Sequence, residues 1–169
     1  MAREAGAHDA GTHQDADGHA RFLAAAREHG IRVEVAERAA ARTLEEAAAI
    51  LGITPGEIVK SLVVKHSDGS FLFALIPGDR QISWPKLRAL LGVNRLSMPA
   101  ADVALAATGY ERGTITPLGS STAWPVVADA AIAGRVSMGA GAHGRSAFLD
   151  SGELVRALGA TVADISDPL

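Results

Sequence analysis

The 169-residue chain contains no cysteine, which excludes disulfides, thiolate metal sites and a cysteine nucleophile. Aromatic residues make up only 4%, which argues against the stacked aromatic platforms of many single-strand nucleic-acid binders. No apolar run approaches the roughly 18–20 residues of a membrane span, and the first twenty residues lack the apolar segment of a signal peptide. Length and these absences together predict a single-domain cytoplasmic protein with no membrane partner.

Acidic residues are in small excess, with a formal net charge of −3, but the charges are unevenly distributed. Residues 58–112 contain seven basic and four acidic side chains and carry +3, whereas residues 1–57 carry −4 and residues 113–169 carry −2. A basic cluster of this kind is either a solvated surface or a contact for a nucleic-acid backbone. Charge alone leaves both interpretations open.

Two apolar runs, 58–66 and 70–78, flank an Asp-Gly pair, which strongly predicts a β-hairpin. The first run is apolar on both faces, as in a strand at the centre of a core. Lys60 interrupts it, on the face that also carries Ile58 and Leu62. A lysine buried there is costly unless it meets an anion or reaches water, so Lys60 is the first functional candidate.

Short helices and strands are expected on both sides of the hairpin. Helices are indicated by N-cap residues such as Thr43 and Ser83 and by closing glycines, at residues 17–28, 44–51, 84–91, 100–107 and after an N-cap at Ser151. Alternating or short apolar runs predict strands at 31–35, 95–98, 126–129, 135–138, 147–149 and 161–165.

The order of these elements bears on the fold class. Short helices and strands interleave without a regular repeat, which predicts an α+β domain over residues 18–169. We expect a single mixed, mostly antiparallel, barrel-like β-sheet with short surrounding helices. Residues 1–17 are rich in Ala, Gly, His and Asp without periodicity and are predicted to form a disordered tail.

Two glycine-rich loops, 108–119 and 139–144, mark the second half of the chain. The second loop reads Gly-x-Gly-x-x-Gly after a predicted strand, but a strand rather than a helix is expected to follow it. It therefore lacks the helix N-terminus that binds the phosphates of a dinucleotide. Either the two loops simply turn corners, or they bring backbone N–H groups close to a ligand, which glycine permits.

Side chains suited to acid–base or nucleophilic catalysis are sparse. There is no Gly-x-Ser-x-Gly elbow, and neither His66 nor His143 has a serine and an aspartate at a spacing that predicts a triad. His8, His13 and His19 do not have the spacing of a compact metal site, so neither a metal ion nor a cofactor is predicted. A hydrolase of this composition would depend on substrate positioning and backbone hydrogen-bond donors.

Several motifs occur in an order and at separations found together in one family. They are Thr43-Leu-Glu-Glu-Ala-Ala, Leu51-Gly52, Ile58-Val-Lys-Ser-Leu-Val, Thr108-Gly-Tyr, Gly113-x-x-x-Pro117-Leu-Gly119 and Leu149-x-Ser-Gly-x-Leu154. Over about residues 20–167 the chain thus resembles the YbaK/EbsC family, aminoacyl-tRNA deacylases related to the editing domain of bacterial prolyl-tRNA synthetase. The strand lysine followed by the Gly-x-x-x-Pro loop is the most specific part of this resemblance.

The resemblance implies trans-editing, which is hydrolysis of the ester that joins a wrong amino acid to its tRNA. It implies a Cys-tRNA(Pro)- or Ala-tRNA(Pro)-type deacylase that is metal-independent and assisted by the substrate's own ribose hydroxyl. The implied partners are the 3′ end of aminoacyl-tRNA and a synthetase such as prolyl-tRNA synthetase. Lys60 and Gly113 are the implied catalytic positions. The implied substrate-binding positions are Ser61, Tyr110, Thr114, Ile115, Thr116, Pro117, Gly139, Gly141, His143 and Ser146.

Two of these positions depart from the family pattern. Thr114 stands where several members have a second glycine, and Ser146 stands where some have an acidic residue. Both departures bear on amino-acid specificity.

The alternative function is that of a non-catalytic member of the same fold that binds tRNA ends or a nucleotide. A third possibility is a purely structural domain, which would require Lys60 to extend to the surface.

Overall fold

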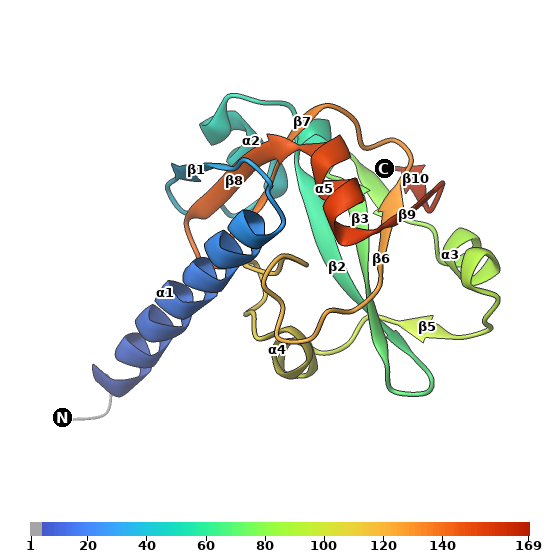
Figure 1. The fold of residues 1–169 in the computed structure, drawn as a ribbon, viewed down its shortest axis with the longest axis horizontal. Helices are drawn as coiled ribbons and strands as arrows, with labels where there is room; N and C mark the ends of the chain where they lie inside the picture. Colours follow the sequence, from blue (N-terminus) through green and yellow to red (C-terminus); the bar gives the residue numbers. More distant parts are fainter. Residues whose placement is uncertain (1–4) are drawn as a thin grey trace.

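The predicted hairpin lies at the centre of the structure, a computed structural model that describes residues 5–169 and the side chains from residue 15 onward (Figure 1). Strands β2 (Val59–His66) and β3 (Phe71–Pro77) pair antiparallel. In the turn between them, Gly69 has a φ of +89°, a left-handed conformation that suits glycine. The turn fixes the register of the pair and thereby the face on which Lys60 lies.

The hairpin belongs to a five-stranded sheet with the strand order β5-β2-β3-β6-β9. Strand β5 (Leu96–Ser97) pairs antiparallel with β2, whereas β6 (Val126–Asp129) pairs parallel with β3, and β9 (Thr161–Ala163) pairs parallel with β6. Two smaller antiparallel sheets have the orders β1-β8-β7 and β10-β4. Their strands are β1 (Glu34–Glu37), β4 (Arg80–Ile82), β7 (Arg135–Gly139), β8 (Arg145–Asp150) and β10 (Ser166–Pro168).

This arrangement confirms the α+β class with mixed, mostly antiparallel pairing. The strands form three sheets rather than the single sheet expected, and an isolated parallel bridge between Ile58 and Ser137 links the central sheet to β7. The short strands β4 and β10 pair 80-odd residues apart in the chain, which no local pattern in the sequence indicates.

The helices begin and end largely where capping residues predict. Thr43 caps α2 and Ser83 caps α3, each by accepting a hydrogen bond from a backbone N–H, while a left-handed glycine ends both helices. The N-cap of α5 is Asp150, which accepts from the N–H of Glu153, so the prediction of Ser151 is wrong by one residue. The helices after α1 are α2 (Leu44–Leu51), η1 (Pro55–Glu57), α3 (Trp84–Leu91), α4 (Ala101–Thr108) and α5 (Ser151–Leu158).

Helix α1 (Ala5–Glu28) is longer than expected and extends away from the rest of the molecule at its N-terminal end (Figure 1). Residues 5–17 are therefore helical where the composition predicts a disordered tail, and residues 1–4 of that prediction lie outside the described residues. Alanine has the highest helix propensity, which favours this extension. In the described part of the chain, α1 included, no helix has both the length and the apolar character needed to cross a bilayer.

Apolar side chains cover both faces of the central sheet. On one face Val59 and Val63 pack with Phe73 and Leu75. On the other face Val64 packs with residues such as Leu72 and Leu87. Because both faces of β2 carry core residues, a charged side chain on this strand can avoid the core only near its ends or along its edge.

Candidate functional site

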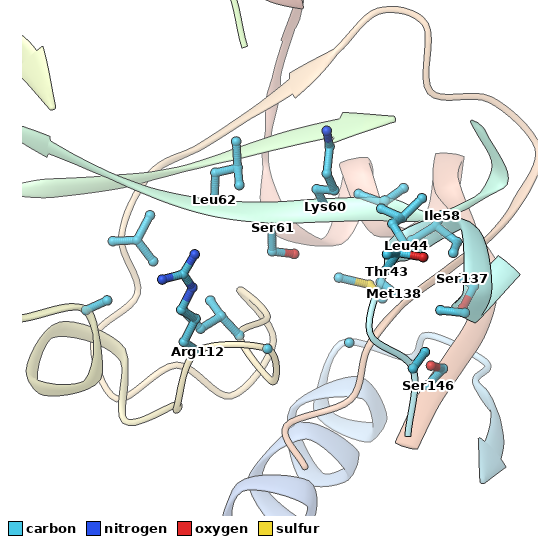
Figure 2. A pocket seen from close by; sticks show the side chains of 18 of the residues that line it. Thr43, Leu44, Ile58, Lys60, Ser61, Leu62, Arg112, Ser137, Met138 and Ser146 are labelled. Carbon is cyan, nitrogen blue, oxygen red and sulfur yellow. The ribbon is translucent and has the colours of Figure 1, made fainter. Parts of the chain in front are cut away.

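A cavity of about 580 Å³ lies along the edge of β2 that faces away from β3 (Figure 2). Strand β2 pairs with β5 only at Lys65 and His66, and the residue before the strand, Ile58, forms an isolated bridge to Ser137 of β7. The edge in between has no partner strand in the described residues. The cavity is closed around that edge by the start of α2, by α4 and by the first glycine-rich loop (residues 108–119, the Gly113 loop), together with β7 and the beginning of β8.

The open edge presents backbone hydrogen-bonding groups to the cavity. In an antiparallel pair, alternate residues direct their N–H and C=O toward the partner strand. The carbonyl of Ile58 accepts from the N–H of Gly78, so the even-numbered residues of β2 bond to β3. The N–H and C=O groups of Ser61 and Val63 therefore point to the open edge. The buried Oγ of Ser61 has no hydrogen-bond partner within the described structure, which leaves it available to a ligand.

The two glycine-rich loops of the sequence contact each other. The N–H of Gly141 donates to the carbonyl of Thr114 at 3.2 Å, and a Cβ on Gly139 would lie 3.2 Å from the carbonyl oxygen of Ile115. Gly113 lies on the cavity with a φ of +91°, which favours glycine there. Gly113, Ile115 and Gly139 thus lie together on one wall of the cavity, and a side chain at Gly139 would crowd the Ile115 carbonyl.

The structure separates the residues implied by the family resemblance into two groups. Those on the cavity are Lys60, Ser61, Gly113, Ile115, Gly139 and Ser146. Those that do not line it are Tyr110, Thr114, Thr116, Pro117, Gly141 and His143. Thr114 uses its Oγ1 to donate to the carbonyl of Glu111 at 2.8 Å, so the departure from glycine stabilises the loop instead of adding a polar group to the cavity.

Lys60 extends from the opposite face of β2 to Ser61, as Figure 2 shows. Its ammonium donates a hydrogen bond to the backbone carbonyl of Arg80. Burial lowers the pKa of Lys60, and the nearby carboxylates of Asp79 and Glu45 act in the opposite direction. Lys60 is therefore an incompletely solvated cation held by a neutral carbonyl oxygen on the face of β2 opposite Ser61, although the residue itself lines the cavity.

Arg21 of α1 binds both ends of the Gly113 loop and does not itself line the cavity. Its guanidinium donates to the carbonyl oxygens of Gly109 at 2.7 Å and Gly119 at 3.2 Å, and it lies 4.7 Å from the centre of the Tyr110 ring. The Tyr110 hydroxyl donates to the carbonyl of Leu118 at 2.7 Å. Tyr110 is thus buried behind the loop, where it fixes the loop's shape.

Replacing Tyr110 by phenylalanine is expected to change the alkaline stability of the protein. Burial raises the pKa of Tyr110 to about 12, from the ordinary value of 10.0. Between these values the folded state holds a proton that the unfolded state has lost, so this contribution is complete below pH 10 and disappears as pH rises through 12. A two-unit difference corresponds to about 3 kcal/mol. Urea unfolding at pH 8, 10 and 11.5 should show a steeper decline for the native chain than for Tyr110→Phe; parallel declines would contradict the assignment.

The residues that line the cavity include basic side chains but no acidic ones. Arg38, Arg42, Lys60 and Arg112 line it, whereas none of the described lining residues is aspartate or glutamate. Arg38 donates from Nε to the Oγ of Ser146 at 3.1 Å, and Figure 2 shows Arg112 reaching from its loop toward β2. Such a cavity favours an anionic ligand.

Sequence reasoning misses Arg38 and Arg42, because both belong to the part of the chain with net negative charge. Antiparallel pairing of β1 with β8 brings Arg38 to Ser146, 108 residues away. A contact of that separation leaves no local signal in the sequence.

Comparisons with known proteins identify the family of the chain. The profile of the family described as "Aminoacyl-tRNA editing domain" matches residues 38–157. The chain is 43% identical over 79 residues to a proline–tRNA ligase from Thermosipho africanus (strain TCF52B), which covers 47% of this chain and 14% of the ligase. It is 32% identical over 125 residues to the proline–tRNA ligase of Geotalea daltonii, covering 73% of this chain and 21% of the ligase. The chain thus spans less than a quarter of the length of these curated relatives.

Among solved structures, the fold is similar to that of a candidate trans-editing enzyme for prolyl tRNA synthetase, with a TM-score of 0.81 and 28% identity. That match covers 89% of this chain and 97% of the other. The hypothetical protein APE2540 matches with a TM-score of 0.79 and 28% identity, over 87% of this chain and 99% of the other.

Proposed function

Because the chain belongs to the aminoacyl-tRNA editing domain family, we propose that it hydrolyses the ester bond of a mischarged aminoacyl-tRNA in trans. One observation carries the proposal: a cavity whose described lining includes four basic residues and no aspartate or glutamate opens onto backbone groups of β2 that no described strand pairs with. The cations suit the phosphates of a tRNA 3′ end, and the backbone groups suit the carbonyl and amino groups of an aminoacyl ester.

The chemistry requires positioning more than an acid–base side chain. The oxygen of a water molecule attacks the ester carbonyl, the bond to the ribose oxygen breaks, and that oxygen takes up a proton as the free amino acid leaves. The described residues lining the cavity include no His, Asp, Glu or Tyr. The neighbouring ribose hydroxyl of the substrate is therefore the group we assign to orient the water, while backbone N–H groups of Ser61 and Gly113 stabilise the developing oxyanion.

The apolar part of the cavity limits the amino acid that can be removed. Val63, Ile115 and Met138 lie on the side of β2 that carries Ser61. We propose that this compartment accepts a small side chain such as alanine or cysteine, joined to tRNA(Pro). The hydroxyl of Ser61 is placed to bind the α-amino group or a polar side-chain atom.

Single-turnover deacylation of a panel of charged tRNAs tests the proposal. Ala-tRNA(Pro) and Cys-tRNA(Pro) should be hydrolysed at least tenfold faster than in buffer, whereas Pro-tRNA(Pro) and Ala-tRNA(Ala) serve as matched controls for the amino acid and for the tRNA. If no ester in the panel is cleaved faster than in buffer, the proposed activity is wrong.

A second candidate, the non-catalytic binding of tRNA ends or nucleotides, has one observation in its favour. The ammonium of Lys60 is bound to the Arg80 carbonyl instead of lying beside Ser61. A non-hydrolysable 3′-amide analogue of Ala-tRNA(Pro) separates the two functions. Tight binding of the analogue without hydrolysis of the ester would support the binding function alone.

Binding of such an analogue should be sensitive to salt, and Arg112 should account for part of that sensitivity. If Arg112 contacts one phosphate, Arg112→Ala should weaken binding roughly tenfold and reduce the slope of log K against log salt by about one. Arg156→Ala, in α5 and away from the cavity, is the matched control and should match the native chain. Fluorescence anisotropy at 50 to 300 mM salt measures the affinity and its salt dependence. An unchanged slope for Arg112→Ala would exclude a phosphate contact of Arg112.

A further inference from the structure

Three metal-ligating side chains from distant parts of the chain meet beside the Gly113 loop. They are Asp15 of α1, Glu111 at the start of the loop, and His143 in the second glycine loop. The pairs are 32 and 128 residues apart along the chain, which is why their sequence spacing predicts no metal site. We propose that Asp15, Glu111 and His143 bind a divalent transition-metal ion of the Zn²⁺ type.

The positions of the ligand atoms fit such an ion. His143 Nε2 lies 3.0 Å from Glu111 Oε2 and 3.9 Å from Asp15 Oδ1, and the three ligand atoms all lie within 4.8 Å of one another. Zinc–nitrogen and zinc–oxygen bonds of about 2.0–2.2 Å place tetrahedral ligands about 3.3 Å apart. The two observed separations lie on either side of that value, so small side-chain rotations would complete the geometry.

The chemistry of the set favours a borderline metal over Ca²⁺ or Mg²⁺. Imidazole suits Zn²⁺ and its neighbours, whereas the hard ions prefer sites built from oxygen alone. The side chain of His143 is about half exposed, which leaves room for water as a fourth ligand. The alternative is a protonated His143 that forms ion pairs with both carboxylates and binds no metal.

A bound ion would connect three segments that form or support the cavity wall. Asp15 lies on α1, and its carboxylate also accepts from the backbone N–H of His143 at 3.3 Å. The His143 ring approaches Gly113, where a Cβ would lie 3.9 Å from Cε1. The ion would therefore hold α1 against both glycine loops. This inference stands independently of the proposed deacylase activity, because it concerns residues outside the cavity.

Isothermal titration of the untagged, metal-free chain with Zn²⁺ tests the inference, with thermal unfolding in excess Zn²⁺ or EDTA as a second readout. We expect one equivalent of Zn²⁺ to bind and to raise the unfolding temperature. His143→Ala and Glu111→Gln should each weaken binding at least tenfold, since even the loss of an outer-shell partner costs 10- to 100-fold. Asp15→Asn provides a third variant if either of the others fails to fold.

The matched control is the double variant His8→Ala/His13→Ala, which removes two histidines near the N-terminus and leaves the proposed ligands in place. It should bind Zn²⁺ as the native chain does. Binding that persists in His143→Ala, or that disappears in the double variant, would overturn the inference. So would the lack of measurable binding, which would identify the cluster as ion pairs only.

Discussion

Replacing Lys60 by methionine is expected to lower kcat/KM for deacylation by about 100- to 1,000-fold, the effect of removing one charged or polar donor from a transition state. The Lys60 ammonium is partly desolvated and bound to the neutral carbonyl of Arg80. A substrate phosphate or oxyanion would replace that neutral acceptor by a charged one, and charge-assisted hydrogen bonds are roughly twice as strong. The flexible stem of lysine allows the ammonium to reach around the edge of β2.

Methionine keeps most of the volume and the unbranched stem of lysine, so the fold should be retained at a cost of about 1 kcal/mol for the hydrogen bond to Arg80. Lys60→Arg keeps the charge and should recover part of the activity. Lys65→Met is the matched control, because Lys65 lies on the same strand but does not line this cavity. Single-turnover rates and urea unfolding should be measured together. Activity of Lys60→Met within threefold of the native chain would show that the Lys60 ammonium does not act in deacylation.

The local part of the fold could be predicted because its signals are local. The hairpin, α2 and α3 are each defined by a turn or cap within a few residues of the apolar pattern. Sequence patterns miss or misplace elements where distant contacts or weak propensities decide the structure. Strand β4 exists because β10 pairs with it, and α1 extends over residues 5–17 although their polar composition suggests disorder.

The site could be predicted only in part, for a similar reason. Lys60 attracts attention as a charge in an apolar strand, and Gly113 follows from a motif, so a sequence contains enough to name both. The free edge of β2 cannot be foreseen, because it depends on β5 pairing with only two residues of that strand. Arg38 reaches the cavity through the pairing of β1 with β8. The sequence thus indicates some of the residues that line the cavity, and tertiary pairing decides which backbone groups and which further side chains face it.

The close packing of α1 on the second glycine loop leads to the largest expected effect on stability, for Gly141→Ala. Gly141 has a φ of +80°, and a Cβ there would lie 2.7 Å from the carbonyl carbon of Gly18 and 2.9 Å from Tyr110 Cε1. A left-handed alanine costs about 1–2 kcal/mol, and overpacking against backbone adds about 1–3 kcal/mol. The expected loss is therefore about 2–5 kcal/mol, which for a chain of this size lowers Tm by roughly 10 °C.

Gly30→Ala separates the cost of a left-handed alanine from the cost of overpacking. Gly30 has a φ of +67°, close to that of Gly141, but nothing lies within 4 Å of the Cβ that alanine would add. It should lose only the conformational term, about 1–2 kcal/mol. Thermal and urea unfolding measure the loss of stability in both variants. The extra loss in Gly141→Ala is the cost of pushing α1 away from the loop. Because that loop contacts Thr114 behind the cavity, Gly141→Ala should also lose deacylase activity at temperatures where it is still folded. Equal stability losses in the two variants would show that α1 does not pack against the loop as closely as the backbone distances indicate.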